Sequence, residues 1–339
     1  MDVMRNRIRP ILDSLRQWRC RFSEELTEVE IRPGDYHFSE KLDADQLKDG
    51  WMPFGACETW GGRDRHFWFR TKVVIRKEWA GKEVRVTLNT GADDIWNTDN
   101  PQIMAYKNGI LSGTMDMNHQ DLILAEEAEV AEVFELVFYA YSNSENPTNF
   151  FHLKAAVYDR EIADLYYDLK VPFEAAELCS EEDLDRIEAM KFLNTAISGL
   201  DLRKPGSEEF YQSVRKVREY VKKNLPDICR SSRVTVHSIG HTHIDVAWKW
   251  PLRQTRQKAV RSFQTVLNLM EQYPEYKFMS SQPQLYEFVK EEAPELFEKI
   301  KEKIHEGRWE AEGGMWLEPD CNLASGESLI RHILYGKSF

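Results

Sequence analysis

The chain has 339 residues, of which 42% are hydrophobic and 12% aromatic, and it carries a formal net charge of −12 at pH 7. This length corresponds to two or three domains, and the apolar content excludes wholesale disorder. The negative charge argues against nucleic acid as a partner, because a phosphate backbone repels it, and it is compatible with a neutral substrate such as a sugar.

The first 22 residues contain basic side chains but no apolar stretch that fits a secretory signal peptide. No run approaches the roughly 18 apolar residues of a membrane span. The cysteines are odd in number, 5 in all, and form no CxxC pair, so neither a disulfide framework nor a cysteine-rich zinc site is indicated. We therefore expect a cytoplasmic protein without a membrane partner.

Residues 1–49 are predicted to form an amphipathic helix, up to about residue 22, and then a connector. Residues 50–160 show the aromatic, β-branched and alternating patterns that are typical of strands. Strands are expected at residues 67–75, 84–88, 103–106, 133–140 and 151–157. Asn108-Gly109 is a hairpin signal, and the series of short strands predicts an antiparallel β-sandwich.

Residues 161–232 are predicted to be a helical linker. Apolar residues recur at helical spacing after Ser180, a candidate N-cap followed by acidic residues. A second helix is expected from about Ser207 to Leu225, stopped by Pro226.

Residues 233–339 alternate strand and helix three times. Strands are expected at residues 233–240, 276–280 and 308–315, Pro294 is expected to interrupt the second helix, and Ser325 to cap the last one. This alternation predicts a parallel sheet with crossover helices, the first β/α units of a barrel. A closed barrel needs roughly 200 residues or more, so the sequence is expected to stop inside this domain.

The densest cluster of chemically versatile side chains is Gly-His-Thr-His-Ile-Asp-Val-Ala-Trp at residues 240–248, where the first parallel strand is expected to end. Ligands of α/β folds bind beyond the carboxyl ends of the strands. His243 and Asp245 are two residues apart, so in an extended segment they point to the same side and can share one divalent ion. His241 is either a third ligand or a group that hydrogen-bonds to a ligand. A polysaccharide deacetylase also fits these spacings.

Residues 241–248 resemble the first metal motif of glycoside hydrolase family 38, the retaining α-mannosidases. The resemblance extends from about residue 234 to residue 339 and is closest to the cytosolic-type and bacterial branch. Further motifs stand in order at residues 250–252, 261–263, 269–270, 281–284, 313–320 and 322–328.

The resemblance implies one divalent ion, zinc by default with cobalt, manganese or calcium as alternatives, bound by His243 and Asp245 with a catalytic aspartate and a distant histidine. Trp248 would be the platform under a mannose ring of an oligosaccharide. The nucleophile is expected in a Trp-Leu-Pro-Asp type motif beyond Phe339. We therefore expect no catalytic residue within this chain, no mannosidase activity of the chain alone, and a homo-oligomer for the intact protein.

Glu318, Asp320 and Asn322 follow the third expected strand, where they are expected to contact substrate or to orient the metal ligands. The alternative for Glu318 and Asp320 is that they make loop hydrogen bonds and cap the next helix. A second hypothesis is a carbohydrate-binding protein without catalysis, in which the sandwich presents a sugar-binding face. Its alternative is that the tryptophans of this region fill the core or dock the catalytic region. The residues of the proposed face are Trp51, Trp60, Trp68, Trp79, Asp93, Asp94, Trp96 and Asn97.

Overall fold

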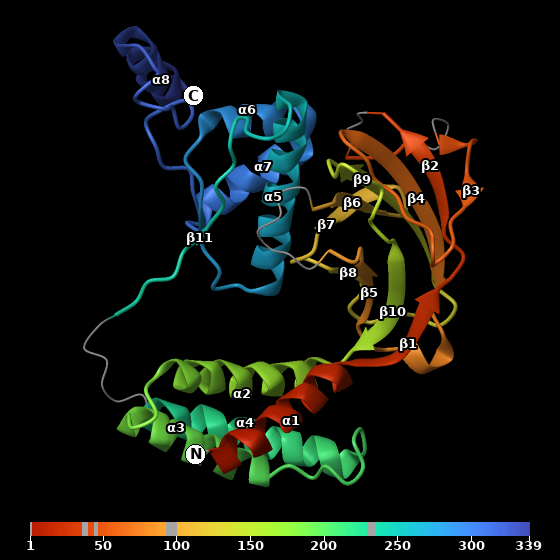
Figure 1. Ribbon diagram of the computed structural model, residues 1–339, viewed down its shortest axis with the longest axis vertical. Helices are drawn as coiled ribbons and strands as arrows, with labels where there is room; N and C mark the ends of the chain where they lie inside the picture. Colours follow the sequence, from red (N-terminus) through yellow and green to blue (C-terminus); the bar gives the residue numbers. More distant parts are fainter. Residues whose placement is uncertain (1, 36–39, 44–46, 93–99, 229–234) are drawn as a thin grey trace.

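The computed structural model describes residues 2–35, 40–43, 47–92, 100–228 and 235–339. Three packed regions are visible in Figure 1: a helical bundle, a β-sandwich, and a β/α unit that ends in the last helix. Among the described helices, none is long and apolar enough to cross a bilayer. The described part of the chain contains four free thiols, those of Cys20, Cys57, Cys179 and Cys321.

The helical bundle joins the start of the chain to its middle. Helices α1 (Asp2–Trp18), α2 (Arg160–Leu178), α3 (Leu184–Ser198) and α4 (Glu208–Ile228) share one apolar core. The N-cap of α3 is Asp183, not Ser180, because the Asp183 side chain accepts a hydrogen bond from the backbone N–H of Asp185. Helix α4 continues through Pro226 to Ile228; this proline lies in the last turn, where it does not disrupt a long helical segment.

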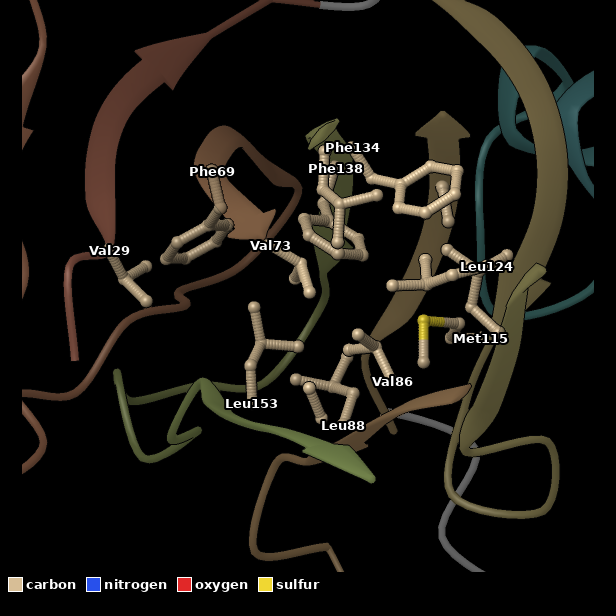
Figure 2. Close-up of a cluster of buried hydrophobic side chains, with 14 of the residues drawn as sticks. Val29, Phe69, Val73, Val86, Leu88, Met115, Leu124, Phe134, Phe138 and Leu153 are labelled. Atoms are coloured by element: carbon tan, nitrogen blue, oxygen red, sulfur yellow. The ribbon is translucent and has the colours of Figure 1, made fainter. Parts of the chain in front are cut away.

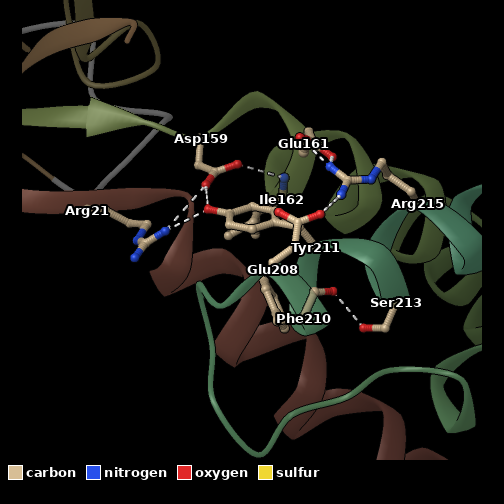
Figure 3. A network of polar contacts seen from close by, with 9 residues as sticks. All are labelled: Arg21, Asp159, Glu161, Ile162, Glu208, Phe210, Tyr211, Ser213 and Arg215. Atoms are coloured by element: carbon tan, nitrogen blue, oxygen red, sulfur yellow. Dashed lines mark hydrogen bonds and ion pairs between the residues drawn. The ribbon is translucent and has the colours of Figure 1, made fainter. Parts of the chain in front are cut away.

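A polar network links this bundle to the sandwich (Figure 3). Arg21 Nη1 donates to the Tyr211 hydroxyl at 2.6 Å, and that hydroxyl donates to Asp159. Asp159 also caps α2 by accepting from the N–H of Ile162 at 3.1 Å. Burial, together with the hydrogen bond to Asp159, raises the pKa of Tyr211 to about 12, so the hydroxyl stays a donor.

The sandwich consists of two antiparallel sheets. The first has the strand order β1-β10-β5-β8 and the second β3-β2-β4-β9-β6-β7. Their bounds are β1 (Cys20–Leu26), β2 (Glu30–Gly34), β3 (Met52–Pro53), β4 (Arg65–Val74), β5 (Val84–Asn89), β6 (Gln102–Lys107), β7 (Ile110–Met115), β8 (Asp121–Ala125), β9 (Val133–Ser142) and β10 (His152–Tyr158). The five predicted strands and the antiparallel pairing are confirmed. The hairpin between β6 and β7 is confirmed too, with Asn108 and Gly109 at φ values of 53° and 80°.

The helix ends at Trp18, before the expected residue 22, and strands β1 (residues 20–26) and β2 (residues 30–34) lie where the end of the helix and the connector were expected. Strand β1 lies at a sheet edge and its side chains are exposed or half-buried, so it lacks the apolar alternation that marks a strand. Strand β2 ends in Pro33-Gly34, whose composition signals a turn. The sequence patterns also do not predict β3 and β8, and they indicate β7 only through the hairpin signal at Asn108-Gly109.

The sandwich core lies between the two sheets (Figure 2), where side chains from β4, β5, β9 and β10 meet. Phe69 and Phe151 stack in parallel, with ring centroids 3.8 Å apart. Trp60 and Trp79 lie in the same core, and their indole N–H groups donate to the carbonyls of Phe150 and Phe22. These two tryptophans therefore fill the core and cannot present a sugar-binding surface.

Two further tryptophans of the proposed sugar-binding face, Trp68 and Trp51, lie outside the sandwich core. Trp68 is buried against the β/α unit, and Trp51 is half-buried with the Arg70 guanidinium 4.5 Å from its ring centroid. The alternative of a docking role is thus confirmed for Trp68. Asp93, Asp94, Trp96 and Asn97 lie outside the described residues.

The β/α unit contains a three-stranded parallel sheet in the order β11-β12-β13. Its strands β11 (Gly240–His241), β12 (Phe278–Met279) and β13 (Trp309–Glu310) alternate with helices α5 (Leu252–Gln272), α6 (Pro283–Glu292), α7 (Pro294–His305) and α8 (Gly326–Ser338). The break at Pro294 and the Ser325 cap, which accepts from the N–H of Ser328 at 3.2 Å, are confirmed. A closed barrel stays a prediction.

All three parallel strands are shorter than expected, and residues 235–239 are not in a strand, while residues 233 and 234 of the first expected strand lie outside the described residues. In this region Val236 is 79% exposed, so its β-branched side chain gains no packing energy from pairing. Helix α5 is central to the unit: its apolar side chains share one cluster with Phe278, Trp309 and the outer face of the six-stranded sheet. The sandwich and the parallel sheet are therefore packed on the same helix.

Candidate functional site

The candidate site lies beyond the carboxyl ends of the parallel strands. The segment after β11 carries His243, Asp245 and Trp248, and the segment after β13 carries Glu318. Since parallel strands end at the same edge of a sheet, these segments meet there. Gly313 permits the approach: it has a φ of +128°, and a Cβ at this position would lie 2.7 Å from the carbonyl oxygen of Ser281.

The imidazole of His243 lies between two carboxylates. Its Nε2 is 3.2 Å from Oδ1 of Asp245, and its Nδ1 is 3.0 Å from Oε2 of Glu318. All three side chains are about half-exposed, at 54%, 42% and 48%. The structure thus brings together three of the residues that the sequence singled out, and it pairs Glu318 with the histidine, a contact that the sequence did not specify.

Gln282 connects the two segments and was not assigned a role from the sequence. Its buried side chain donates from Nε2 to the carbonyl of Ile244 at 3.1 Å, and its Oε1 accepts from the N–H of Glu318 at 3.4 Å. Ser281 Oγ also lies 3.4 Å from Oε1 of Glu318. Their position in the sequence could have indicated a role in the site, because Ser281 and Gln282 follow the second expected parallel strand.

A second set of contacts holds the backbone of Asp245. The fully buried Thr255 donates to the carbonyl of Asp245 at 3.4 Å and accepts from the indole N–H of Trp250 at 3.0 Å. Trp250 in turn meets Trp248 edge to face, with centroids 6.0 Å apart. The metal-motif segment is therefore tied to the first turn of α5.

Trp248 offers an accessible aromatic surface, since it is 56% exposed. The Lys249 ammonium is 4.9 Å from its ring centroid, and Lys258 lies 4.2 Å from the Trp250 centroid. Burial, with a further contribution from Arg261, lowers the pKa of Lys258 to about 7. The cationic and aromatic groups lie on the α5 side of the site, and the carboxylates lie around His243.

The remaining predicted residues have other partners. His241 Nδ1 lies 2.9 Å from the carbonyl of Met279 in the neighbouring strand, so it can donate there and leave Nε2 unprotonated. Asp320 Oδ1 accepts from the N–H of Asn322 at 2.8 Å, in the turn before α8. Asp320 therefore makes a loop hydrogen bond, in which Asn322 takes part through its backbone N–H only, and the N-cap of α8 is Ser325.

The His243–Asp245 pair fits a shared divalent ion. Two donors about 2.1 Å from one ion lie roughly 3.0–3.4 Å apart for bond angles of about 90–110°, and the observed separation is 3.2 Å. Glu318 has the position of the carboxylate that fixes the tautomer of a ligating histidine. Among the described residues, no group of three or more His, Cys, Asp and Glu side chains is arranged to hold an ion, so these residues fit as part of a ligand set.

Comparisons with known proteins agree with these motifs. Residues 233–339 match the model of the glycosyl hydrolases family 38 N-terminal domain. The chain is 30% identical over 333 residues to alpha-mannosidase G of Dictyostelium discoideum, which covers 94% of this chain and 29% of that protein. Alpha-mannosidase 2C1 of Mus musculus is 29% identical over 290 residues (80% and 27%), and alpha-mannosidase of Saccharomyces cerevisiae is 30% identical over 296 residues (80% and 26%). The chain spans less than a third of the length of each relative.

Proposed function

The chain belongs to glycosyl hydrolase family 38, and from this we propose that it supplies part of the active site of a metal-dependent retaining α-mannosidase, which removes terminal α-mannosyl residues from oligosaccharides. The observation that carries the proposal is the imidazole of His243 between Asp245 and Glu318, beside the exposed ring of Trp248.

His243 and Asp245 are the residues that would hold the ion, with zinc as the default and cobalt, manganese or calcium as alternatives. When bound, the ion supplies a Lewis acid that holds hydroxyls of the terminal mannose and favours ring distortion. With the ion bound, Glu318 would accept the Nδ1 proton of His243 and leave the Nε2 lone pair to bind the ion beside Asp245. His241 is a further candidate ligand through Nε2.

The substrate would lie against Trp248, because the C–H groups on one face of a pyranose pack on an indole. Glu318, Asp320 and Asn322 are proposed to line the same side of the sugar. Retaining hydrolysis needs two carboxyl groups, a nucleophile and an acid/base. These groups and the other ligands are proposed to lie outside these 339 residues, since the chain contains no Trp-Leu-Pro-Asp motif and spans less than a third of its relatives. The whole protein is proposed to be cytoplasmic and homo-oligomeric, in line with the cytosolic-type branch that the motifs resemble.

Two observations favour this proposal over its alternatives. The relatives are named α-mannosidases, which favours a glycosidase over a polysaccharide deacetylase. The burial of Trp60, Trp68 and Trp79 disfavours a carbohydrate-binding role for the sandwich.

The test compares hydrolysis of 4-nitrophenyl α-mannoside by the full-length gene product and by the 339-residue chain. We expect turnover only by the full-length protein, with loss after chelation and recovery with zinc or one of the alternative ions. His243→Ala in the full-length protein should abolish turnover, and His305→Ala, at an exposed position on α7, should not. Turnover by the 339-residue chain would contradict the placement of the nucleophile, and an inactive full-length protein with all four ions would contradict the mannosidase proposal.

A further inference from the structure

Helix α5 carries a stripe of polar residues, spaced four apart, that faces the six-stranded sheet. Residues at this spacing lie on one side of a helix. Each stripe residue has a partner on the sandwich: Arg253 pairs with Asp64, Gln257 Nε2 lies 3.4 Å from the Tyr139 hydroxyl, Arg261 donates to Gln102, and Thr265 Oγ1 lies 2.5 Å from Thr114 Oγ1. The sandwich is therefore held in one register along α5.

Near the start of α5, contacts from the sandwich also hold the segment that carries Trp248. Asn143, which follows β9, accepts from the N–H of Asp64 at 3.2 Å and donates to the carbonyl of Lys249 at 3.3 Å. Asp64 has a φ of +52°, in the left-handed region that non-glycine residues rarely adopt. In this conformation its carboxylate forms the ion pair with Arg253. Asp64 and Asn143 thus hold the chain on both sides of Trp250-Pro251.

These contacts continue into the site. Trp250 lies between Lys249 and Arg253 along the chain. Its indole N–H donates to the hydroxyl of Thr255, which in turn donates to the carbonyl of Asp245. The edge-to-face contact of Trp250 orients Trp248. A connected set of contacts therefore leads from the sandwich to a proposed metal ligand and to the proposed sugar platform.

We propose that Asp64 and Asn143 are positioning residues of the site, which fix the orientation of residues 245–250 from the sandwich. The proposal rests on the mannosidase assignment for its consequence in catalysis, but not for the conformation of the segment. The Asp64 and Arg253 side chains are 36% and 48% exposed, and ion pairs with such exposure contribute little to stability. The effect on the segment is thus separable from the effect on folding.

The first experiment uses the 339-residue chain labelled with 5-fluorotryptophan and followed by fluorine NMR. Trp248→Phe and Trp250→Phe assign the two resonances of the segment. Asp64→Asn keeps a residue that tolerates positive φ and removes the charge, and Asn143→Ala removes both amide contacts. We expect the Trp248 and Trp250 resonances to shift or broaden in both variants, with unchanged resonances of the core residues Trp60 and Trp79 and an unchanged melting temperature.

The matched control is Asn146→Ala, at an exposed position in the same loop as Asn143, which should leave all resonances in place. Unchanged Trp248 and Trp250 resonances in both test variants would overturn the proposal. A lower melting temperature together with shifts of all tryptophan resonances would also overturn the proposal, because that pattern indicates that the two residues have a structural role alone.

In the full-length protein, the same two variants should lower kcat/KM for 4-nitrophenyl α-mannoside by about 10–100-fold, since misplacement by about 1 Å has effects of this size. Asn143→Asp keeps the acceptor for the Asp64 N–H but has no donor for the Lys249 carbonyl, so it should not restore the loss. If the resonances shift but the unmodified full-length protein has no mannosidase activity, the positioning role stands and the mannosidase assignment fails. If the resonances shift and both variants keep full kcat/KM, the positioning role for catalysis is overturned.

Discussion

The Nδ1 atom of His243 lies 3.0 Å from a carboxylate oxygen of Glu318, so the segments after the first and third parallel strands meet at one imidazole. The opposite ring nitrogen faces Asp245 at 3.2 Å. A carboxylate behind a histidine fixes which nitrogen carries the proton and raises the basicity of the other one. Of the two roles expected for Glu318, contact with substrate and orientation of a metal ligand, this contact supports the second.

Glu318→Gln should weaken divalent-ion binding to the full-length protein by about 10–100-fold, because the partner of a ligating histidine is lost as a charge but kept as an acceptor. The measurement is a calorimetric titration with zinc. Glu312→Gln, at an exposed position on the same segment, is the control and should bind as the unmodified chain does. Equal affinities of the two variants would show that Glu318 does not act through His243.

Trp248→Ala should raise the KM of the full-length protein for an α-mannoside by about tenfold, the equivalent of about 1.4 kcal/mol of aromatic contact. Trp248→Phe should recover part of this loss, because a phenyl ring offers a smaller apolar face. Since the indole is 56% exposed, neither change should alter the melting temperature. An unchanged KM in the alanine variant would remove Trp248 from the sugar site.

Phe69→Ala should destabilise the sandwich by about 3–5 kcal/mol, because it removes a fully buried ring and leaves a cavity against Phe151. The measurement is the shift of the urea transition followed by circular dichroism. Val74→Ala lies in the same strand but is 54% exposed, and it should cost less than about 1 kcal/mol. Similar shifts for the two variants would contradict the assignment of Phe69 to the core.

Asp116 and His119 form a pH-dependent pair, with His119 Nδ1 3.1 Å from Oδ1 of Asp116. The hydrogen bond to Asp116 raises the pKa of His119. Burial would raise the pKa of Asp116, but the hydrogen bonds and the charge of His119 lower it to about 2.

The sign of each effect follows from these pKa values. The stabilisation from charged His119 is complete below its unfolded pKa of about 6.5 and is lost as the pH rises through the higher folded value. The stabilisation from ionised Asp116 is present above about pH 4 and is lost as the pH falls toward 2. An NMR titration of the His119 ring should give a midpoint above 6.5, and Asp116→Asn should lower it. A midpoint that does not respond to Asp116→Asn would contradict the pairing.

Much of the local structure could be predicted from the sequence. Where the prediction failed, the failure has a physical cause. The hairpin at Asn108-Gly109 and the cap at Ser325 depend on side chains and backbone within a few residues. The strands β1 and β2 escaped prediction because strands at or near a sheet edge need no apolar alternation. The burial of Gln257 and Arg261 against the sandwich was not predicted, because their partners Tyr139 and Gln102 are distant along the chain.

The sequence by itself determined the periodic elements, the turns and the motif of His243, Asp245 and Trp248, because each depends on the order of neighbouring residues. Only the tertiary structure decided that Glu318 meets His243, that Trp60 is a core residue while Trp68 docks the β/α unit, and that Asn143 holds the carbonyl of Lys249. These pairings join segments that are distant along the chain. A hydrogen bond requires convergence within about 3 Å in space, which no local pattern encodes.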